Sequence, residues 1–470
     1  MFTKHTKIVA TIGPATESKE MLEKLVLAGL NVMRLNFSHG DFAEHQARVD
    51  NLRAVSKKLD RPVAILQDLS GPKIRIGEFD TERVDLEAGK KISLVTGKKF
   101  IGNETRVWVN YPTLHKELHK GSIVFVDDGK KKLIVESIKK NEIACKVIVG
   151  GNTKGRRGVN LPGAYLKTSS LTKKDREDLQ FGIKNDVDFF ALSFVRQAKD
   201  VVELRDILQQ AKSDAQIIAK IETEEAIENL EDIIAVADGI MIARGDLAIE
   251  VPAEKVPLYQ KRMIELCRQA NKPVITATQM LESMINSPVP TRAEVSDVAN
   301  AIFDGTDAVM LSEETTLGSY PVEAVSVMAR VANEVETHGR AHFKNGHENK
   351  MLYDELAQSA LRIAGAVDAK AIVAITESGS TARALASRRP TQPIIAATGD
   401  FKTETRLTLS FGCFPLHTTD KGSFESVMKQ VSLFVKTNKL AKRGDNIVVI
   451  FGEPVGKKGT TANAVSVQCI

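Results

Sequence analysis

Short apolar runs rich in β-branched residues recur along the first two thirds of the chain, and stretches with helical periodicity separate most of them. The helical stretches include residues 17–28, 42–57 and 256–270. Alternating strands and helices favour a parallel sheet, and eight such units predict a (β/α)8 TIM barrel. The eight predicted strands are residues 7–13, 31–38, 63–70, 188–195, 216–222, 239–246, 273–280 and 307–314.

The pattern changes between the third and fourth predicted strands. Short segments with alternating apolar and polar residues appear there, punctuated by Gly, Asn and Asp, which is typical of all-β structure. We therefore predict an inserted β-barrel lid domain at residues 72–168, which divides the barrel into residues 1–71 and 169–345. Active sites of such barrels lie on the strand-to-helix loops, so an insertion at this place is suited to act as a lid.

A second α/β pattern follows a polar stretch at residues 337–351, which we interpret as a linker. This pattern predicts a C-terminal α/β regulatory domain over residues 346–470. Its predicted strands are residues 371–376, 394–398, 414–418, 446–451 and 464–469.

Composition narrows the possible partners and compartments. The 65 Lys and Arg residues exceed the 60 Asp and Glu residues by only five, which argues against a nucleic-acid-binding groove. Four widely spaced cysteines without a CxxC pair argue against a disulfide framework or a zinc site. No apolar run reaches the length of a signal peptide core or a membrane span. We therefore expect a cytoplasmic protein with no nucleic-acid and no membrane partner.

Lys220 lies inside the apolar run 216–222, and Glu222 follows two residues later. Burying an unpaired ammonium group is costly, and residues i and i+2 of a strand point to the same side. We therefore expect both side chains to face one site. Polar residues near the C-terminal ends of the other predicted strands would meet them at the barrel mouth. These are Arg34, Asn36, Ser38, Asp68, Arg244, Asp246, Thr276, Thr278 and Ser312.

The residue types at this mouth indicate a chemistry. Glu222 and Asp246, without histidine or cysteine, suit a hard cation such as Mg²⁺ or Mn²⁺. Lys220 and Arg34 add fixed positive charge, and Gly245 with Asp246 begins a turn whose free backbone N–H groups can bind an anion. This combination favours phosphoryl transfer. The alternative is that the two carboxylates and the two cations form only structural ion pairs.

Several long motifs are more specific than these spacings. They include TKIVATIGPATES, VMRLNFSHGD, IIAKIET, IMIARGDLAIEVP, TATQMLESM and PTRAEVSDVANAIFDGTDAVML. In these motifs the chain resembles bacterial pyruvate kinase over essentially its whole length. The resemblance implies an enzyme of the last step of glycolysis, which makes pyruvate and ATP from phosphoenolpyruvate and ADP. It also implies a homotetramer.

The resemblance implies a role for each residue that matches a family motif. Lys220 would stabilise the phosphoryl group in flight, Arg34 would hold that group, and Glu222 with Asp246 would hold the divalent ion. Gly245, the backbone of Asp246 and Thr278 would receive the substrate carboxylate. Thr278 and Ser312 would lie near the route that protonates the enolate. On the lid, Arg75 and Arg157 would reach the nucleotide phosphates, Arg157 standing where a lysine is usual.

One departure from the family pattern concerns the monovalent cation. Asn36, Ser38, Asp68 and the carbonyl of Leu69 resemble the potassium site of the family. Where the family has a glutamate near that cation, this chain has Lys73, whose ammonium could replace the ion. The chain thus resembles the potassium-independent Leu/Lys branch, and we predict that K⁺ is not required. The alternative is that Lys73 is an exposed lysine at the lid hinge.

The segment ITESGSTAR in the C-terminal domain predicts a strand, a turn rich in hydroxyl groups and glycine, and a helix. Backbone amides and hydroxyl groups there could hold a phosphate at the helix N-terminus, and the segment resembles the family's sugar-phosphate effector loop. Glu377 would repel a second phosphate, which favours a monophosphate such as ribose 5-phosphate or AMP over fructose 1,6-bisphosphate. A plain helix cap is the alternative. The candidate residues are Thr376, Ser378, Gly379, Ser380 and Thr381.

Two other functions compete with phosphoryl transfer. A metal-dependent lyase or aldolase of phosphoenolpyruvate or pyruvate would share the carboxylate pair and an arginine, but it would not explain the inserted lid or the phosphate loop. A regulatory protein without catalysis would be expected to have lost Lys220, Glu222 or Asp246, and all three are present. A measured turnover distinguishes the regulatory protein from an enzyme.

Overall fold

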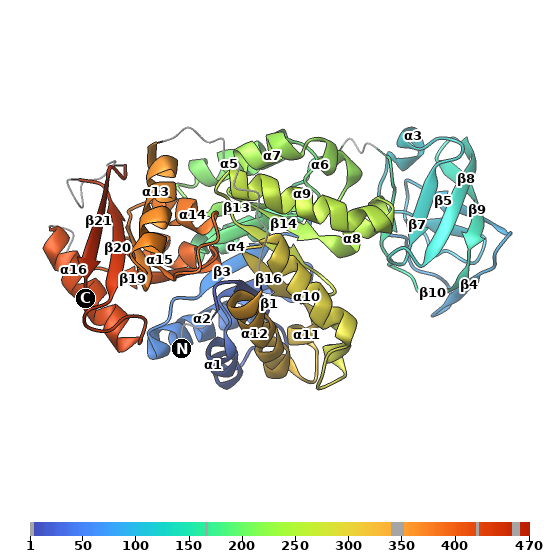
Figure 1. Cartoon of the computed structure of the whole chain (residues 1–470). Helices are drawn as coiled ribbons and strands as arrows, with labels where there is room; N and C mark the ends of the chain where they lie inside the picture. The colour runs from blue at the N-terminus through green and yellow to red at the C-terminus, as the bar shows by residue number, and fades with distance from the viewer. Residues whose placement is uncertain (1–3, 165–167, 340–351, 420–422, 454–460) are drawn as a thin grey trace.

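The computed structural model describes the chain except residues 1–3, 165–167, 340–351, 420–422 and 454–460. It forms three units in a row (Figure 1). A barrel lies in the middle, an all-β unit lies next to helix α8 (Arg244–Glu250) on one side, and the C-terminal unit lies at the opposite end. The predicted boundary between barrel and C-terminal domain, at residues 345 and 346, falls outside the described residues.

Eight parallel strands close into the predicted barrel, in the order β1-β16-β15-β14-β13-β12-β3-β2. The ring closes where β1 pairs with both β2 and β16. The strands are β1 (Lys7–Thr11), β2 (Val32–Asn36), β3 (Ala64–Asp68), β12 (Phe189–Leu192), β13 (Gln216–Ile221), β14 (Gly239–Ala243), β15 (Val274–Ala277) and β16 (Ala308–Leu311).

The predicted strand at residues 239–246 was too long at its C-terminal end. Strand β14 ends at Ala243, and Arg244 already begins helix α8. Gly245 and Asp246 therefore lie in the first turn of a short helix, where the first N–H groups of the helix have no partner within it.

Helices cover the outside of the barrel, and side-chain caps start several of them. Thr291 starts α10 with a capping box, because its hydroxyl accepts from Glu294 N while the Glu294 side chain accepts from Thr291 N. The helical segments of this layer are α1 (Lys19–Ala28), α2 (Phe42–Leu59), α4 (Lys173–Lys184), α5 (Ala198–Gln210), α6 (Glu224–Glu228), α7 (Leu230–Val236), α8, η1 (Ala253–Lys255), α9 (Val256–Gln269), η2 (Glu282–Ile285), α10 (Arg292–Asp304), α11 (Glu313–Thr316) and α12 (Pro321–His338).

The described part of the insertion after β3 is all-β apart from one short helix, as the alternating pattern predicts. Its described strands pair into a six-stranded sheet, order β11-β7-β8-β9-β5-β6, and a two-stranded sheet of β10 and β4. Alternate residues of these strands are buried in a separate apolar core. The elements are β4 (Val84–Leu86), β5 (Lys91–Val95), β6 (Arg106–Trp108), α3 (Leu114–Glu117), β7 (Ile123–Val126), β8 (Lys131–Lys139), β9 (Glu142–Val149), β10 (Gly151–Thr153) and β11 (Val159–Asn160).

The C-terminal unit is a five-stranded sheet, order β19-β18-β17-β20-β21, in which only β21 is antiparallel. It seals the bottom of the barrel, because Leu409 packs within the barrel's interior core and Arg389 forms a buried ion pair with Asp307, which directly precedes β16. The elements are α13 (Leu352–Ala366), β17 (Ala371–Ile375), α14 (Ser380–Ala386), β18 (Ile394–Thr398), α15 (Phe401–Arg406), η3 (Leu407–Leu409), β19 (Cys413–His417), α16 (Phe424–Thr437), β20 (Asn446–Phe451) and β21 (Ala464–Cys469).

All four cysteines are free, as their spacing predicts. Within the described segments, no helix combines the length and the apolar composition needed to cross a membrane.

Candidate active site

The barrel interior is layered, and the layer at its mouth is charged. Val32, Leu66, Ala191 and Ile218 belong to one apolar interior core. Two residues further along the same strands stand Arg34, Asp68, Ser193 and Lys220. Because side chains two apart on a strand point to the same side, the apolar layer forms a floor beneath these four polar side chains.

Lys220 is the centre of this polar layer. Its Nζ lies 3.0 Å from Glu222 Oε1 and 3.2 Å from Asp68 Oδ1, and it donates to Ser193 Oγ at 2.7 Å. Its side chain is 11% exposed, and those of the two carboxylates are 1% and 2% exposed. The structure thus brings Lys220 and Glu222 to one place, as their spacing predicts.

Mutual pairing keeps this buried lysine and Asp68 charged. Burial opposes the ammonium form, but Asp68 and Glu222 outweigh it and raise the pKa of Lys220. Burial likewise opposes ionisation of Asp68, and Lys220 with Arg34 outweighs it and lowers that pKa. The result is a fixed ammonium group held between carboxylates.

Glu222 and Asp246 are the two carboxylates that the sequence predicts as ligands of a divalent cation. Burial, reinforced by the nearby charge of Asp246, raises the pKa of Glu222 despite the neighbouring Lys220. A divalent cation would favour the ionised form of both acids. Among the described residues, no group of three or more His, Cys, Asp or Glu side chains is placed to hold a metal ion. Two carboxylates fit Mg²⁺, which usually completes its six ligands with water and substrate oxygens.

Arg34 is fixed from two sides within the same layer. Its Nε donates to Asp68 Oδ2 at 2.7 Å, and its Nη1 donates to Thr11 Oγ1 at 2.8 Å. Asp68 on β3 therefore connects Arg34 on β2 with Lys220 on β13, across the intervening β12. Their positive charge at the mouth suits a multiply charged anion.

Thr278 follows β15 in a strained conformation. Its φ is +69°, which is rare for a β-branched residue, and Gln279 has φ +53°. The Thr278 hydroxyl accepts from Gly245 N at 2.8 Å and donates to the Ala277 carbonyl at 2.7 Å. Strain of this kind persists where the surrounding structure holds it, often at functional sites.

Two polar residues of the predicted mouth lie elsewhere. Thr276 is fully buried and donates to Thr306 Oγ1 at 3.0 Å. It points outward because Ile275 and Ala277 are the residues of β15 that face the barrel interior. Arg244 forms an ion pair with Asp297 at 2.7 Å and binds the carbonyls of Ala277 and Thr278, so it supports the loop after β15.

Ser312 directly follows β16 and is half-buried. Its backbone N–H donates to Glu314 Oε2 at 2.7 Å, and its carbonyl accepts from Thr316 N at 3.2 Å. These contacts hold the backbone of Ser312 at the end of its strand.

Sequence reasoning missed Ser193 and Phe194. Ser193 Oγ donates to the Leu69 carbonyl at 2.7 Å while it accepts from Lys220, and Phe194 N donates to Glu222 Oε2 at 2.7 Å. The alternation rule that found Lys220 also places Ser193 inward, two residues after the buried Ala191. Only the fold could bring Phe194 N to Glu222, because the two residues stand on different loops.

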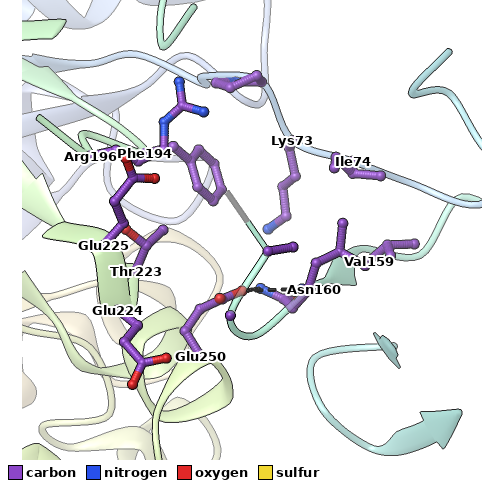
Figure 2. Close-up of a pocket in the computed structure, with 14 residues that line it drawn as sticks. Lys73, Ile74, Val159, Asn160, Phe194, Arg196, Thr223, Glu224, Glu225 and Glu250 are labelled. Atoms are coloured by element: carbon purple, nitrogen blue, oxygen red, sulfur yellow. Dashed lines mark hydrogen bonds between the residues drawn. The ribbon is translucent and has the colours of Figure 1, made fainter. Parts of the chain in front are cut away.

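Residues that resemble the family's potassium site contact other groups in the structure. Asn36 Oδ1 accepts from Ser38 N at 3.1 Å, and the Leu69 carbonyl lies against Ser193. Figure 2 shows the Lys73 side chain in a pocket that Glu250 also lines. Among the described residues no ion pair joins Lys73 to Asp68.

The two lid arginines lie near each other on the strands that lead into and out of the insertion. Arg75 forms a β-bridge with Gly158, and Arg157 directly precedes Gly158. The Arg157 side chain is 44% exposed and its Nε lies 3.2 Å from Asp127 Oδ1. Both are placed on the connection between lid and barrel.

The predicted effector loop closes on its own polar groups. Thr376 Oγ1 accepts from Gly379 N at 3.0 Å, and the hydroxyls of Ser378 and Ser380 lie 3.1 Å apart. Gly379 has φ +79°, which favours glycine, and Thr381 is buried in α14. The loop therefore joins β17 to α14 in the order that the pattern predicts.

Comparison with known proteins identifies the family. The family model described as the pyruvate kinase barrel domain matches residues 3–325, and that of the pyruvate kinase alpha/beta domain matches residues 354–468. The chain belongs to the pyruvate kinase family. It is therefore a phosphotransferase. The family's activity converts phosphoenolpyruvate and ADP into pyruvate and ATP, as the resemblance implied.

Individual pyruvate kinases agree with this assignment. The chain is 44% identical over 466 residues to the pyruvate kinase of Staphylococcus aureus strain MRSA252, which covers 97% of this chain and 79% of that protein. It is 40% identical over 470 residues to that of Clostridium acetobutylicum, covering 99% of each. A crystal structure of a pyruvate kinase from Cryptosporidium parvum superposes with a TM-score of 0.93 at 36% identity, covering 99% of this chain and 96% of that one.

Proposed function

We propose that the charged layer at the barrel mouth is the site of phosphoryl transfer in this pyruvate kinase. The observation that carries the proposal is Lys220, held as a cation between buried Asp68 and Glu222 and next to Arg34. A buried triad of this kind contributes little to stability, but it preorganises positive charge for a transferring phosphoryl group. This argues against the purely structural ion pairs considered from the sequence.

In this proposal each residue acts on one part of the substrate. Lys220 and Arg34 bind the phosphoryl group as its bond to the enolate oxygen breaks and a bond to the terminal oxygen of ADP forms. Gly245, the Asp246 backbone and Thr278 bind the substrate carboxylate. The Thr278 hydroxyl, with Ser312 and water, conducts a proton to the methylene carbon of the enolate. Arg75 and Arg157 on the lid bind the nucleotide phosphates.

Glu222 and Asp246 would hold Mg²⁺ or Mn²⁺. When bound, the ion supplies Lewis-acid stabilisation of the negative charge on the enolate and phosphoryl oxygens. The hard oxygen donors and the raised pKa of Glu222 support this assignment.

We also propose that the enzyme does not require K⁺. Lys73 carries a cation on the segment that links β3 to the lid, where the family has a glutamate. In the structure its side chain is directed into the pocket that Glu250 also lines (Figure 2). The proposal therefore needs Lys73 to turn towards Asn36, Ser38 and Asp68 when substrate binds.

For regulation and assembly we propose a phosphate effector at the loop of Thr376, Ser378, Gly379, Ser380 and Thr381. A monophosphate such as ribose 5-phosphate or AMP fits the neighbouring carboxylate of Glu377 better than a bisphosphate does. Homotetramer formation and a cytoplasmic location stay predictions, and light scattering of the purified protein tests the first.

The experiment that tests these proposals is pyruvate formation from phosphoenolpyruvate, ADP and Mg²⁺, with K⁺ replaced by tetramethylammonium. Full activity without K⁺ would support Lys73 as the internal cation. Activity that returns only with K⁺ would keep the kinase and contradict the role of Lys73. A lack of turnover with K⁺ and candidate effectors present would contradict the proposed site.

A further inference from the structure

The lid is joined to the barrel by two strands of chain that run side by side. Val159 N donates to the Ile74 carbonyl at 2.9 Å, Ile76 N donates to the Arg157 carbonyl at 3.0 Å, and Arg75 bridges Gly158. These hydrogen bonds make the connection a two-stranded ribbon. A contact that fixes one strand of the ribbon therefore restrains both.

Glu250 makes such a contact from the barrel side. Its Oε1 accepts from Asn160 Nδ2 at 3.4 Å and from Leu161 N at 3.3 Å (Figure 2). The neighbouring residue Ile249 lies against the turn between β7 and β8, where a Cβ added to Gly129 would be 3.4 Å from Ile249 Cγ1. Two successive residues of one helix thus contact the lid, one at the ribbon and one at a turn.

Both contacts come from α8, the helix whose first turn carries Gly245 and Asp246. The helix has seven residues and is therefore about 10 Å long. Its beginning belongs to the candidate metal and substrate site, and its end holds the lid. A helix this short moves as one piece, so the position of its last turn is linked to that of its first.

We propose that Glu250 is a positioning residue that clamps the lid ribbon to α8, and so fixes the lid relative to the site at the barrel mouth. The inference rests on the proposed function, in which Asp246 binds the metal and the lid arginines bind the nucleotide. Both hydrogen bonds are long, which suits a contact that restrains the lid but is broken at low cost when it moves.

The surroundings of Glu250 argue that the contact is not there to stabilise the fold. Burial raises its pKa to about 7, the two hydrogen bonds from the lid oppose this, and the charges of Asp246 and Glu224 add to it. Lys73, Glu225 and Arg196 also line the pocket that contains it. A neutral side chain would occupy this place at less cost, so the carboxylate is best explained by the two donors on the lid.

The lid carries its own probe of motion. Trp108 is the single tryptophan of the chain and lies in β6 of the lid, where its Nε1 donates to the Gly97 carbonyl. Its fluorescence anisotropy decay therefore reports the mobility of the lid without any label. This measurement needs no enzymatic activity, so it tests the clamp even where the proposed function fails.

The decisive variants are Glu250→Ala and Glu250→Gln, with Glu254→Gln as the matched control. Glu254 is exposed, lies in η1 four residues further on, and makes no described contact with the lid. Removal of the acceptor in Glu250→Ala should increase the mobility of Trp108 and raise KM for ADP roughly tenfold, with KM for phosphoenolpyruvate changed less than about twofold. Glu250→Gln keeps the acceptor oxygen and should restore both values to near those of wild type, and Glu254→Gln should match wild type.

A variant on the lid serves as a control for misfolding of the barrel. Asn160→Ala removes one donor and should show a smaller change in the same direction. Combined with Glu250→Ala it should add almost nothing, because the shared contact is already lost. Additive effects of the two changes would overturn the clamp. Wild-type anisotropy and ADP affinity in Glu250→Ala, or a Glu250→Gln variant as impaired as Glu250→Ala, would overturn it as well.

Discussion

Ion pairs at the barrel mouth and ion pairs on the lid use the same residue types in opposite surroundings. At the mouth, Lys220 lies 3.0 Å from Glu222, and the two side chains are 11% and 1% exposed. On the lid, Lys154 lies 3.0 Å from Glu82, with side chains 39% and 81% exposed. Equal distances therefore have unequal consequences, since water screens the lid pair and not the buried one.

The comparison shows how the molecule divides its tasks. The buried charges cannot move apart without leaving an unpaired charge, so they hold the site in one geometry. The lid pair contributes little to stability, because both of its partners are exposed to water. Glu250 lies at the boundary between barrel and lid, where a half-buried carboxylate accepts from the Leu161 N–H of the lid.

The largest effect is expected at the centre of the mouth. Lys220→Met should lower kcat by about 10³-fold or more, because it removes charge stabilisation of the transferring phosphoryl group. It should also cost roughly 3–5 kcal/mol of stability, because buried Glu222 loses its ammonium partner and Asp68 keeps only Arg34. Steady-state kinetics and urea denaturation measure both quantities.

The matched change on the lid is Lys154→Met, which should stay within about 0.5 kcal/mol of wild type with unchanged kcat. Similar losses of stability in Lys220→Met and Lys154→Met would show that burial does not make the two ion pairs differ in strength.

A second, smaller effect concerns the divalent ion. Asp246→Asn should weaken Mn²⁺ binding and lower kcat by at least roughly 10²-fold, since even groups that only support metal ligands cost 10- to 100-fold when changed. Electron paramagnetic resonance of free Mn²⁺ measures the binding independently of turnover. Asp297→Asn, which alters only the partner of Arg244, should leave Mn²⁺ affinity unchanged. Wild-type Mn²⁺ affinity in Asp246→Asn would remove Asp246 from the metal site.

Thr278 and Thr276 lie two residues apart, and we expect one to affect catalysis and the other to affect stability. Thr278→Gly relieves a φ of +69° and should keep stability within about 1 kcal/mol of wild type, while the loss of the hydroxyl lowers kcat by about 10²-fold. Thr276→Val should do the reverse, because it breaks the buried hydrogen bond to Thr306 at a cost of roughly 1–3 kcal/mol and leaves kcat alone. Thermal denaturation and kinetics of both variants decide whether the two hydroxyls differ in this way.

Another effect, limited to stability, is a pH dependence at the boundary between barrel and lid. The folded pKa of Glu250 is raised from 4.5 to about 7, so its favourable contribution is complete below pH 4.5 and is lost as the pH rises through 7. Glu250→Gln does not titrate. It should match wild type near pH 4.5 and become more stable than wild type by at most about 3 kcal/mol at pH 8. A stability difference that shrinks as the pH rises would contradict the raised pKa.

Periodicity predicted much of this molecule because its rules are local. Alternation along a strand found Lys220 with Glu222, and it found Arg34, because the inward side of each strand was marked by neighbouring apolar residues. The five strands of the C-terminal sheet and the all-β lid followed from the same kind of pattern. The family motifs then indicated phosphoryl transfer, which the comparisons support.

The same rule was wrong for Thr276, where both sides of β15 are apolar and a shift by one residue exchanges inside for outside. It placed Arg244 and Asp246 on a strand because nothing in their spacing marks the change from β14 to α8. It also could not locate the Lys73 side chain, because a lysine side chain has many accessible conformations.

Local spacing therefore determined which side chains of each strand turn towards the barrel axis. Successive side chains of a strand alternate in direction, so one residue known to face the interior fixes the direction of its neighbours. Contacts between distant segments were decided by folding alone. Glu250 meets Asn160 across 90 positions, Phe194 meets Glu222 across 28, and Leu409 enters the interior of a barrel to which it contributes no strand. Such meetings depend on how whole elements pack, and no short-range pattern in the chain records them.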